Sequence, residues 1–158
     1  MEHKYQHVFT PIKLGPIKLK NRIVSLPMMS GLSTTDGKVT PQMLAHMRAR
    51  AKTGAGLITI GDSAIDYKYA VTHYTPLNLG SEENLAGLTQ LAEEVHRYGA
   101  KIGIELQHGG RMSYEPILTS GRRLAVSPDL AGGEHENETM EGRSKQDAIC
   151  LLYTSRCV

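Results

Sequence analysis

The sequence predicts an α/β fold in which an N-terminal hairpin precedes alternating strands and helices. Two short alternating segments flank a Gly-Pro break near the start, which is typical of a hairpin. Apolar runs at residues 23–29, 56–61 and 101–106 have the length of buried strands, and helical patterns separate them. Such βαβ units build a parallel sheet, so we expect a doubly wound sheet or the first three units of a (β/α)8 barrel.

The composition excludes several other classes of protein. The 158 residues include 18 Lys and Arg against 16 Asp and Glu, without a basic cluster, which argues against nucleic-acid binding. No apolar run approaches the ~18 residues of a membrane span, and the polar start lacks the apolar core of a signal peptide. We therefore expect a cytoplasmic protein without a membrane partner.

The hairpin and the first strand come first along the chain. Strands at residues 8–14 and 17–20 flank the break, and the run at 23–29 predicts a buried strand. Pro27 ends this strand because proline cannot donate to a ladder. A Ser/Thr/Gly-rich loop follows.

Two helices separate the remaining strands. Thr40-Pro41 matches an N-cap with proline at the first helical position, and Gly54 is the predicted stop. A second helix begins at Ser81 with acidic residues in its first turn and ends near Gly99.

The strand exits are the predicted functional positions, because ligands of parallel α/β proteins bind at the carboxyl ends of the strands. Three segments lie there: Leu26, Pro27, Met28 and Met29; Gly61, Asp62, Ser63 and Ala64; and residues 105–111, from Glu105 to Arg111. An apolar surface bordered by polar residues suits a planar heteroaromatic ring, although the spacing does not identify which ring. The absence of a G-x-G-x-x-G after the first strand weakens the dinucleotide-binding alternative.

Each of these residues also has a structural interpretation. Pro27 and Met28 could simply end a core strand, and Asp62 or Ser63 could cap a helical turn in an exit loop at 62–66. His108 alone is typical of a structural histidine. Glu105 is harder to explain in this way, because an unpaired carboxylate on a buried strand is costly.

The sequence resembles the Old Yellow Enzyme family of flavin-dependent ene-reductases, which includes NADH:flavin oxidoreductases and 2,4-dienoyl-CoA reductases. The matching motifs are Phe9-Thr10-Pro11-Ile12, Leu19-Lys20-Asn21-Arg22, Pro27-Met28, Gly54-Ala55-Gly56, and His108 followed by Gly110-Arg111. The resemblance implies a (β/α)8 barrel with FMN across its mouth and the hairpin at the other end.

The resemblance also implies the cofactor-binding residues. Leu26, Pro27 and Met28 match positions that pack on the flavin ring, and Met29 stands where relatives often carry Cys or Thr. Asp62 stands where many relatives have a small residue, and Glu105 where many have Gln at the pyrimidine edge. A carboxylate there would repel the anionic reduced flavin unless Arg111 or protonation offsets it.

The last nine residues, 150–158, form a separate segment. They can be encoded by DNA that is its own reverse complement and that continues into a stop codon, as in a sequencing adapter joined to its inverse. We therefore interpret residues 1–149 as the N-terminal part of a flavin-binding barrel and 150–158 as a translated adapter. The two cysteines, both in this tail, then carry no information.

The expected activity of the full-length parent is NAD(P)H-driven, FMN-dependent reduction of an activated alkene such as an enone or enoyl thioester. Its catalytic residues would lie beyond the truncation. A long multidomain parent would also carry an iron–sulfur cluster and FAD, and a homo-oligomer is left open. The alternatives are a catalytically inert fragment, or a barrel of other chemistry such as a metal-dependent lyase using Glu105 and His108.

Overall fold

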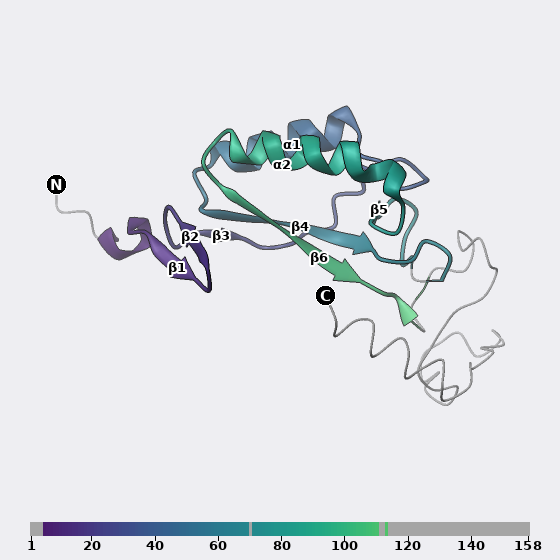
Figure 1. Ribbon diagram of the computed structural model, residues 1–158, viewed down its shortest axis with the longest axis horizontal. Helices are drawn as coiled ribbons and strands as arrows, with labels where there is room; N and C mark the ends of the chain where they lie inside the picture. Colours follow the sequence, from purple (N-terminus) through teal and green to yellow (C-terminus); the bar gives the residue numbers. More distant parts are fainter. Residues whose placement is uncertain (1–4, 70, 111–112, 114–158) are drawn as a thin grey trace. The chain divides into compact units, whose positions relative to one another are not determined.

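The computed structural model describes residues 5–69, 71–110 and 113 (Figure 1). The chain divides into two compact units. The first comprises the chain up to Ser63 together with Thr75–Leu106, and the second comprises Ala64–Tyr74 and the chain from Gln107. The predicted partner Arg111 and the proposed tail at 150–158 lie outside the described residues.

The N-terminal hairpin is present. Strands β1 (Ile12–Leu14) and β2 (Ile17–Leu19) pair antiparallel, with Ile12 opposite Leu19. The prediction that the first strand starts at residue 8 was wrong, because Gln6–Phe9 form a 3-10 helix, η1. The side chain of Thr10 closes this turn by donating to the His7 carbonyl at 2.8 Å.

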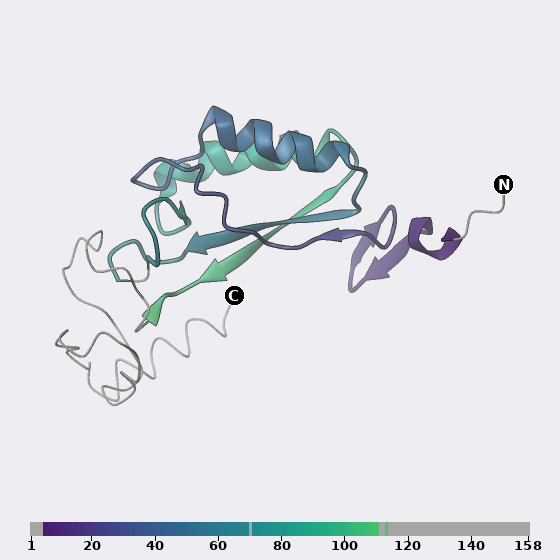
Figure 2. The same cartoon turned by 180° about the vertical axis from the view of Figure 1, so that it is seen from behind.

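The second sheet is built around a central strand. β4 (Leu57–Ala64) pairs with β3 (Val24–Ser25), β5 (Leu77–Asn78) and β6 (Lys101–Gln107). β3 runs parallel to β4, and the arrowheads of β4 and β6 point the same way in both views (Figures 1 and 2). The predicted α/β fold with a parallel sheet is confirmed.

Two helices cover one side of this sheet. They are α1 (Pro41–Lys52) and α2 (Leu85–His96), the latter preceded by the 3-10 helix η2 (Glu82–Asn84) (Figures 1 and 2). The predicted N-cap is confirmed, because Thr40 Oγ1 accepts from the Met43 amide at 3.1 Å. The core cluster of the first unit comprises Met43, Met47, Ala51, Ala55, Ile58, Ile60, Leu77, Leu91, Val95 and Ala100.

An ion-pair cluster joins the two helices. Arg48 on α1 donates from Nε to Glu94 Oε1 on α2 at 2.6 Å, and Arg97 Nη1 lies 3.5 Å from Glu94 Oε2. The hydrogen bond from Arg48 holds the pKa of the Glu94 carboxyl below its usual range. In the described part of the chain, neither helix has the length and apolar content of a bilayer crossing.

The strands differ from their predicted form in three respects. β3 is only two residues long and Val24 is 41% exposed, so this strand is not buried. β4 continues through Asp62 and Ser63 to Ala64, so these residues cap no helical turn. Its pairing with β6 extends the strand beyond the local sequence signal. β6 itself is largely exposed, because among the described strands it pairs with β4 alone.

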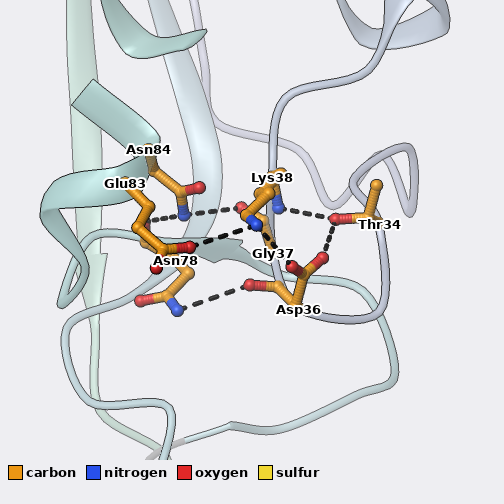
Figure 3. A network of polar contacts seen from close by, with 7 residues as sticks. All are labelled: Thr34, Asp36, Gly37, Lys38, Asn78, Glu83 and Asn84. Atoms are coloured by element: carbon orange, nitrogen blue, oxygen red, sulfur yellow. Dashed lines mark hydrogen bonds and ion pairs between the residues drawn. The ribbon is translucent and has the colours of Figure 1, made fainter. Parts of the chain in front are cut away.

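A polar network attaches the loop after β3 to β5 and η2 (Figure 3). Asn84 Nδ2 donates to the carbonyl oxygens of Gly37 at 3.2 Å and Asn78 at 2.8 Å. Lys38 Nζ pairs with Asp36 at 3.0 Å and with Glu83 at 3.2 Å. The stretch of this loop around residues 36–38 is therefore fixed to β5 and η2.

Candidate functional site

The exit of β3 forms an apolar platform, which we define as residues 26–29. Leu26, Met28 and Met29 are 70%, 66% and 65% exposed, and Pro27 is half-buried. Because these side chains do not contribute to the core, the interpretation of Pro27-Met28 as the end of a core strand is wrong. Exposed Leu and Met side chains in sequence provide an adaptable apolar surface.

Gly61 on β4 allows the platform to lie directly against the strand. A β-carbon at Gly61 would stand 2.4 Å from the Met28 nitrogen and 2.8 Å from the Pro27 carbonyl carbon. Any larger residue would push the two backbones apart, since contacts this short do not occur. The close approach brings the platform beside the neighbouring Asp62.

Arg50 holds the start of the platform from the helix side. Its Nη2 donates to the Leu26 carbonyl and to Ser25 Oγ, both at 2.6 Å, and its Nε donates to Ser25 Oγ at 3.1 Å. Its Nη1 reaches the Thr59 carbonyl on β4 at 3.5 Å. One guanidinium therefore joins α1, the end of β3 and β4.

Asp62 and Glu105 form the polar edge beside the platform. Asp62 is buried, and its φ of 64° places it in the left-handed region, which an aspartate tolerates better than most residues. Its amide donates to Glu105 Oε2 at 3.2 Å. Glu105 is exposed rather than buried, and among the described residues its Oε1 has no hydrogen-bond or ion-pair partner.

The expectation that Glu105 is buried is therefore wrong, because β6 is an edge strand among the described strands. Of the predicted cofactor-binding residues, the structure places Pro27 and Met28 against Gly61, and it joins Asp62 to Glu105. Leu26 and Met29 flank Pro27 and Met28 in the chain, and the binding role of all six stays a prediction. The predicted pairing of Glu105 with Arg111 stays a prediction, because Arg111 lies outside the described residues.

His108 belongs to the second unit. Its Nδ1 accepts from the Gly110 amide at 3.1 Å, which assigns the proton of the neutral ring to Nε2. Burial lowers the pKa of His108, and the nearby Asp66 opposes this to a smaller extent. Among the described residues no group of three or more His, Cys, Asp or Glu is placed to hold a metal ion.

Gly61 stands in one of the predicted segments, but neither its close approach to the platform nor the contacts of Arg50 were predicted from the sequence. A glycine inside a strand can mark a close backbone approach, so Gly61 carried a usable signal. The hydrogen bonds of Arg50 leave no such signal in the sequence, because two of its partners, Ser25 and Leu26, are 25 and 24 positions away.

The apolar platform and its hydrogen-bonding edge lie at the strand exits of an α/β protein, which is the arrangement that the sequence predicts for a flat ring. Residues 7–148 match the model of the NADH:flavin oxidoreductase / NADH oxidase family, and the chain belongs to this family. It is 42% identical over 141 residues to an NADPH dehydrogenase of Bacillus subtilis (strain 168), covering 85% of this chain and 41% of that protein.

Solved structures of the Old Yellow Enzyme group are similar as well. Morphinone reductase in complex with tetrahydroNAD superposes with a TM-score of 0.77 at 26% identity, over 94% of this chain and 44% of that one. Old Yellow Enzyme from Pichia sp. AKU4542 gives 0.71 at 27% identity, over 77% and 32%. The chain spans less than half the length of the curated relatives that it matches.

The residues present fit the flavin that this family's name implies. The exposed platform offers apolar contact to a ring face, and the open Oε1 of Glu105 is an acceptor for a ring N–H. Asp62 fixes the other carboxylate oxygen, so the acceptor is oriented before a ligand arrives.

Proposed function

We propose that the full-length protein containing this chain is an FMN-dependent oxidoreductase that uses NAD(P)H to reduce activated alkenes. Bound FMN would supply the hydride chemistry, first accepting from NAD(P)H and then donating to the alkene. The substrate would be a small enone or enoyl thioester, and the setting cytoplasmic. An iron–sulfur cluster and FAD, expected only for a multidomain form, stay predictions.

One observation carries this proposal: the exposed platform and the acceptor of Glu105 meet at the same strand exits. Leu26, Met28 and Met29 would pack on one face of the ring, with Pro27 keeping the segment out of the ladder. Glu105 would accept from the ring N–H, held in place by the Asp62 amide. The rest of a (β/α)8 barrel, which we also propose, would enclose the other ring edges.

The test starts from the purified full-length protein. We expect a yellow protein with a flavin absorption spectrum that oxidises NADH or NADPH when an enone is added. A colourless protein that gains no flavin on addition of FMN would contradict the proposal.

A matched pair of variants tests the location of the site. Met28→Glu places a charge on the platform and should abolish or greatly weaken FMN binding, because a buried unpaired carboxylate is costly. Leu14→Glu makes the same change at a 54% exposed residue of the hairpin and should leave FMN binding intact. Equal FMN affinity in the two variants would place the flavin elsewhere.

A further inference from the structure

Arg50 is a half-buried cation whose hydrogen-bond partners are all neutral. In the described part of the chain it donates to Ser25 Oγ and to the carbonyl oxygens of Leu26 and Thr59, and no carboxylate contacts it. Arg48, two residues earlier on the same helix, is paired with Glu94 instead. The positive charge of Arg50 is therefore not neutralised by any residue that the structure describes around it.

Such an arrangement is costly by itself. Removing an arginine from water without an acidic partner loses hydration free energy, and this burial lowers the pKa of the Arg50 guanidinium. The group still carries its charge, because an arginine in a protein is not deprotonated. This loss of hydration free energy is offset where the cation makes an interaction that a neutral side chain cannot make.

The position of Arg50 indicates the interaction for which its charged side chain is needed. β3 ends at Ser25 and Pro27 has no N–H to donate, so the platform leaves the sheet ladder almost at once. Within the described residues, the Leu26 carbonyl is held by Arg50, and the Pro27–Met28 backbone rests on Gly61. The guanidinium is thus the polar anchor of the platform.

We propose that Arg50 is a positioning residue of the flavin site, whose guanidinium anchors the platform and whose unpaired charge favours the reduced, anionic flavin over the oxidised one. This inference rests on the proposed function. Arg50 acts through the Leu26 carbonyl and through its field, which is weakly screened where the cation is half-buried.

The charge of Arg50 opposes that of Glu105. A reduced flavin that gains negative charge is stabilised by a nearby cation and destabilised by a nearby carboxylate. Removing the cation should therefore lower the reduction potential. A residue with only a structural role would not move this quantity in a fixed direction.

Three variants of the full-length protein test the proposal. Arg50→Met removes the charge and the hydrogen bonds, whereas Arg50→Lys keeps the charge but loses the forked geometry. Lys52→Met removes a positive charge from the same turn of α1, where Lys52 Nζ lies over the Tyr98 ring instead of the platform. The measurements are the dissociation constants of oxidised and reduced FMN and the midpoint potential at matched pH.

Arg50→Met should weaken binding of oxidised FMN about tenfold and that of reduced FMN threefold to tenfold more. The latter ratio is a fall in potential of up to ~30 mV for a two-electron couple. Arg50→Lys should weaken FMN binding while the potential stays within a few millivolts of wild type. Lys52→Met should match wild type in both quantities.

An Arg50→Met protein that binds FMN with wild-type affinity and potential would overturn the inference. If Arg50→Met does not fold, the Arg50→Lys variant tests the anchoring role. An FMN affinity of Arg50→Lys equal to that of wild type would contradict this role. A wild-type protein that binds no FMN contradicts the proposed function instead, so the two failures are distinguishable.

Discussion

At the scale of single residues, the candidate site combines one cation and two carboxylates around an apolar surface. Among the described residues, Glu105 accepts from the Asp62 amide with one oxygen and leaves the other open, while Arg50 donates to neutral oxygens. The net charge near the platform is therefore set by a few side chains that can be changed singly. Substitutions at Arg50 and Glu105 should shift a flavin potential in opposite directions.

Glu105→Gln should raise the flavin reduction potential of the full-length protein. A glutamine can still accept from the Asp62 amide, so the geometry is kept while the negative charge is lost. Because Glu105 is exposed and screened by water, we expect a change of a few tenths of a kcal/mol, or about 10 mV.

The control for this prediction is Glu93→Gln, which removes a charge from an exposed position of α2. Its midpoint potential should equal that of wild type. A lowered or unchanged potential in Glu105→Gln, with FMN still bound stoichiometrically, would mean that Glu105 is neutralised or does not face the flavin.

His108 gives the second unit a predictable pH dependence. Burial lowers its folded-state pKa below the ordinary value near 6.5, so the unfolded chain binds the proton more readily. The stability from the neutral ring is complete above pH 6.5 and is lost as the pH falls through the lowered pKa.

The measurement is the thermal midpoint of the full-length protein at pH 7.5 and 5.5. His108→Gln should show a smaller fall between these values than wild type, because glutamine does not titrate. His46→Gln, a substitution at an exposed position on α1, should keep the wild-type fall. Identical pH profiles for wild type and His108→Gln would show that this ring does not couple folding to pH.

At the scale of elements, the contact between the platform and β4 depends on Gly61. Gly61→Ala should lower the free energy of unfolding by about 1–3 kcal/mol, because the new methyl group collides with the backbone of Met28. The displaced platform should also bind FMN more weakly. Both are measured on the full-length protein, by denaturant unfolding and by flavin titration.

Gly103→Ala is the matched control on β6. A β-carbon there would meet the Thr59 side chain at 3.7 Å, which is an ordinary contact. It should leave both quantities close to wild type. A Gly61→Ala protein that resembles this control would contradict the close approach.

The sequence predicts best those helix and strand ends that depend on adjacent residues rather than on a distant partner strand. Thr40 and Pro41 carry the N-cap and first turn of α1 in adjacent residues, so the start of this helix was predicted. The second helix was predicted from Ser81, whereas residues 82–84 form the 3-10 helix η2 and α2 begins at Leu85. β5 was missed, because two residues, Leu77 and Asn78, form no pattern without their partner strand. Asp62 was expected in a loop, because the pairing of β4 with β5 and β6 cannot be seen in the local sequence.

At the scale of the whole molecule, the uncovered apolar surface of the first unit determines how this chain behaves alone. The platform is exposed, and so are Ile104 and Leu106 on β6, at 38% and 52%. These two share a strand face with Ile102, which packs against the core beside the helices. An exposed edge strand with apolar side chains is a typical site of association.

The 158-residue chain alone should therefore self-associate and show no alkene reduction. Sedimentation velocity should detect species larger than a monomer at micromolar concentration. The double substitution Leu26→Ser with Leu106→Ser should shift the distribution towards monomer, because it removes apolar area from the uncovered surface. Leu85→Ser, at a 64% exposed position of α2 outside that surface, should have a smaller effect. A monomer that melts cooperatively with flavin bound would show that the described units need no further cover.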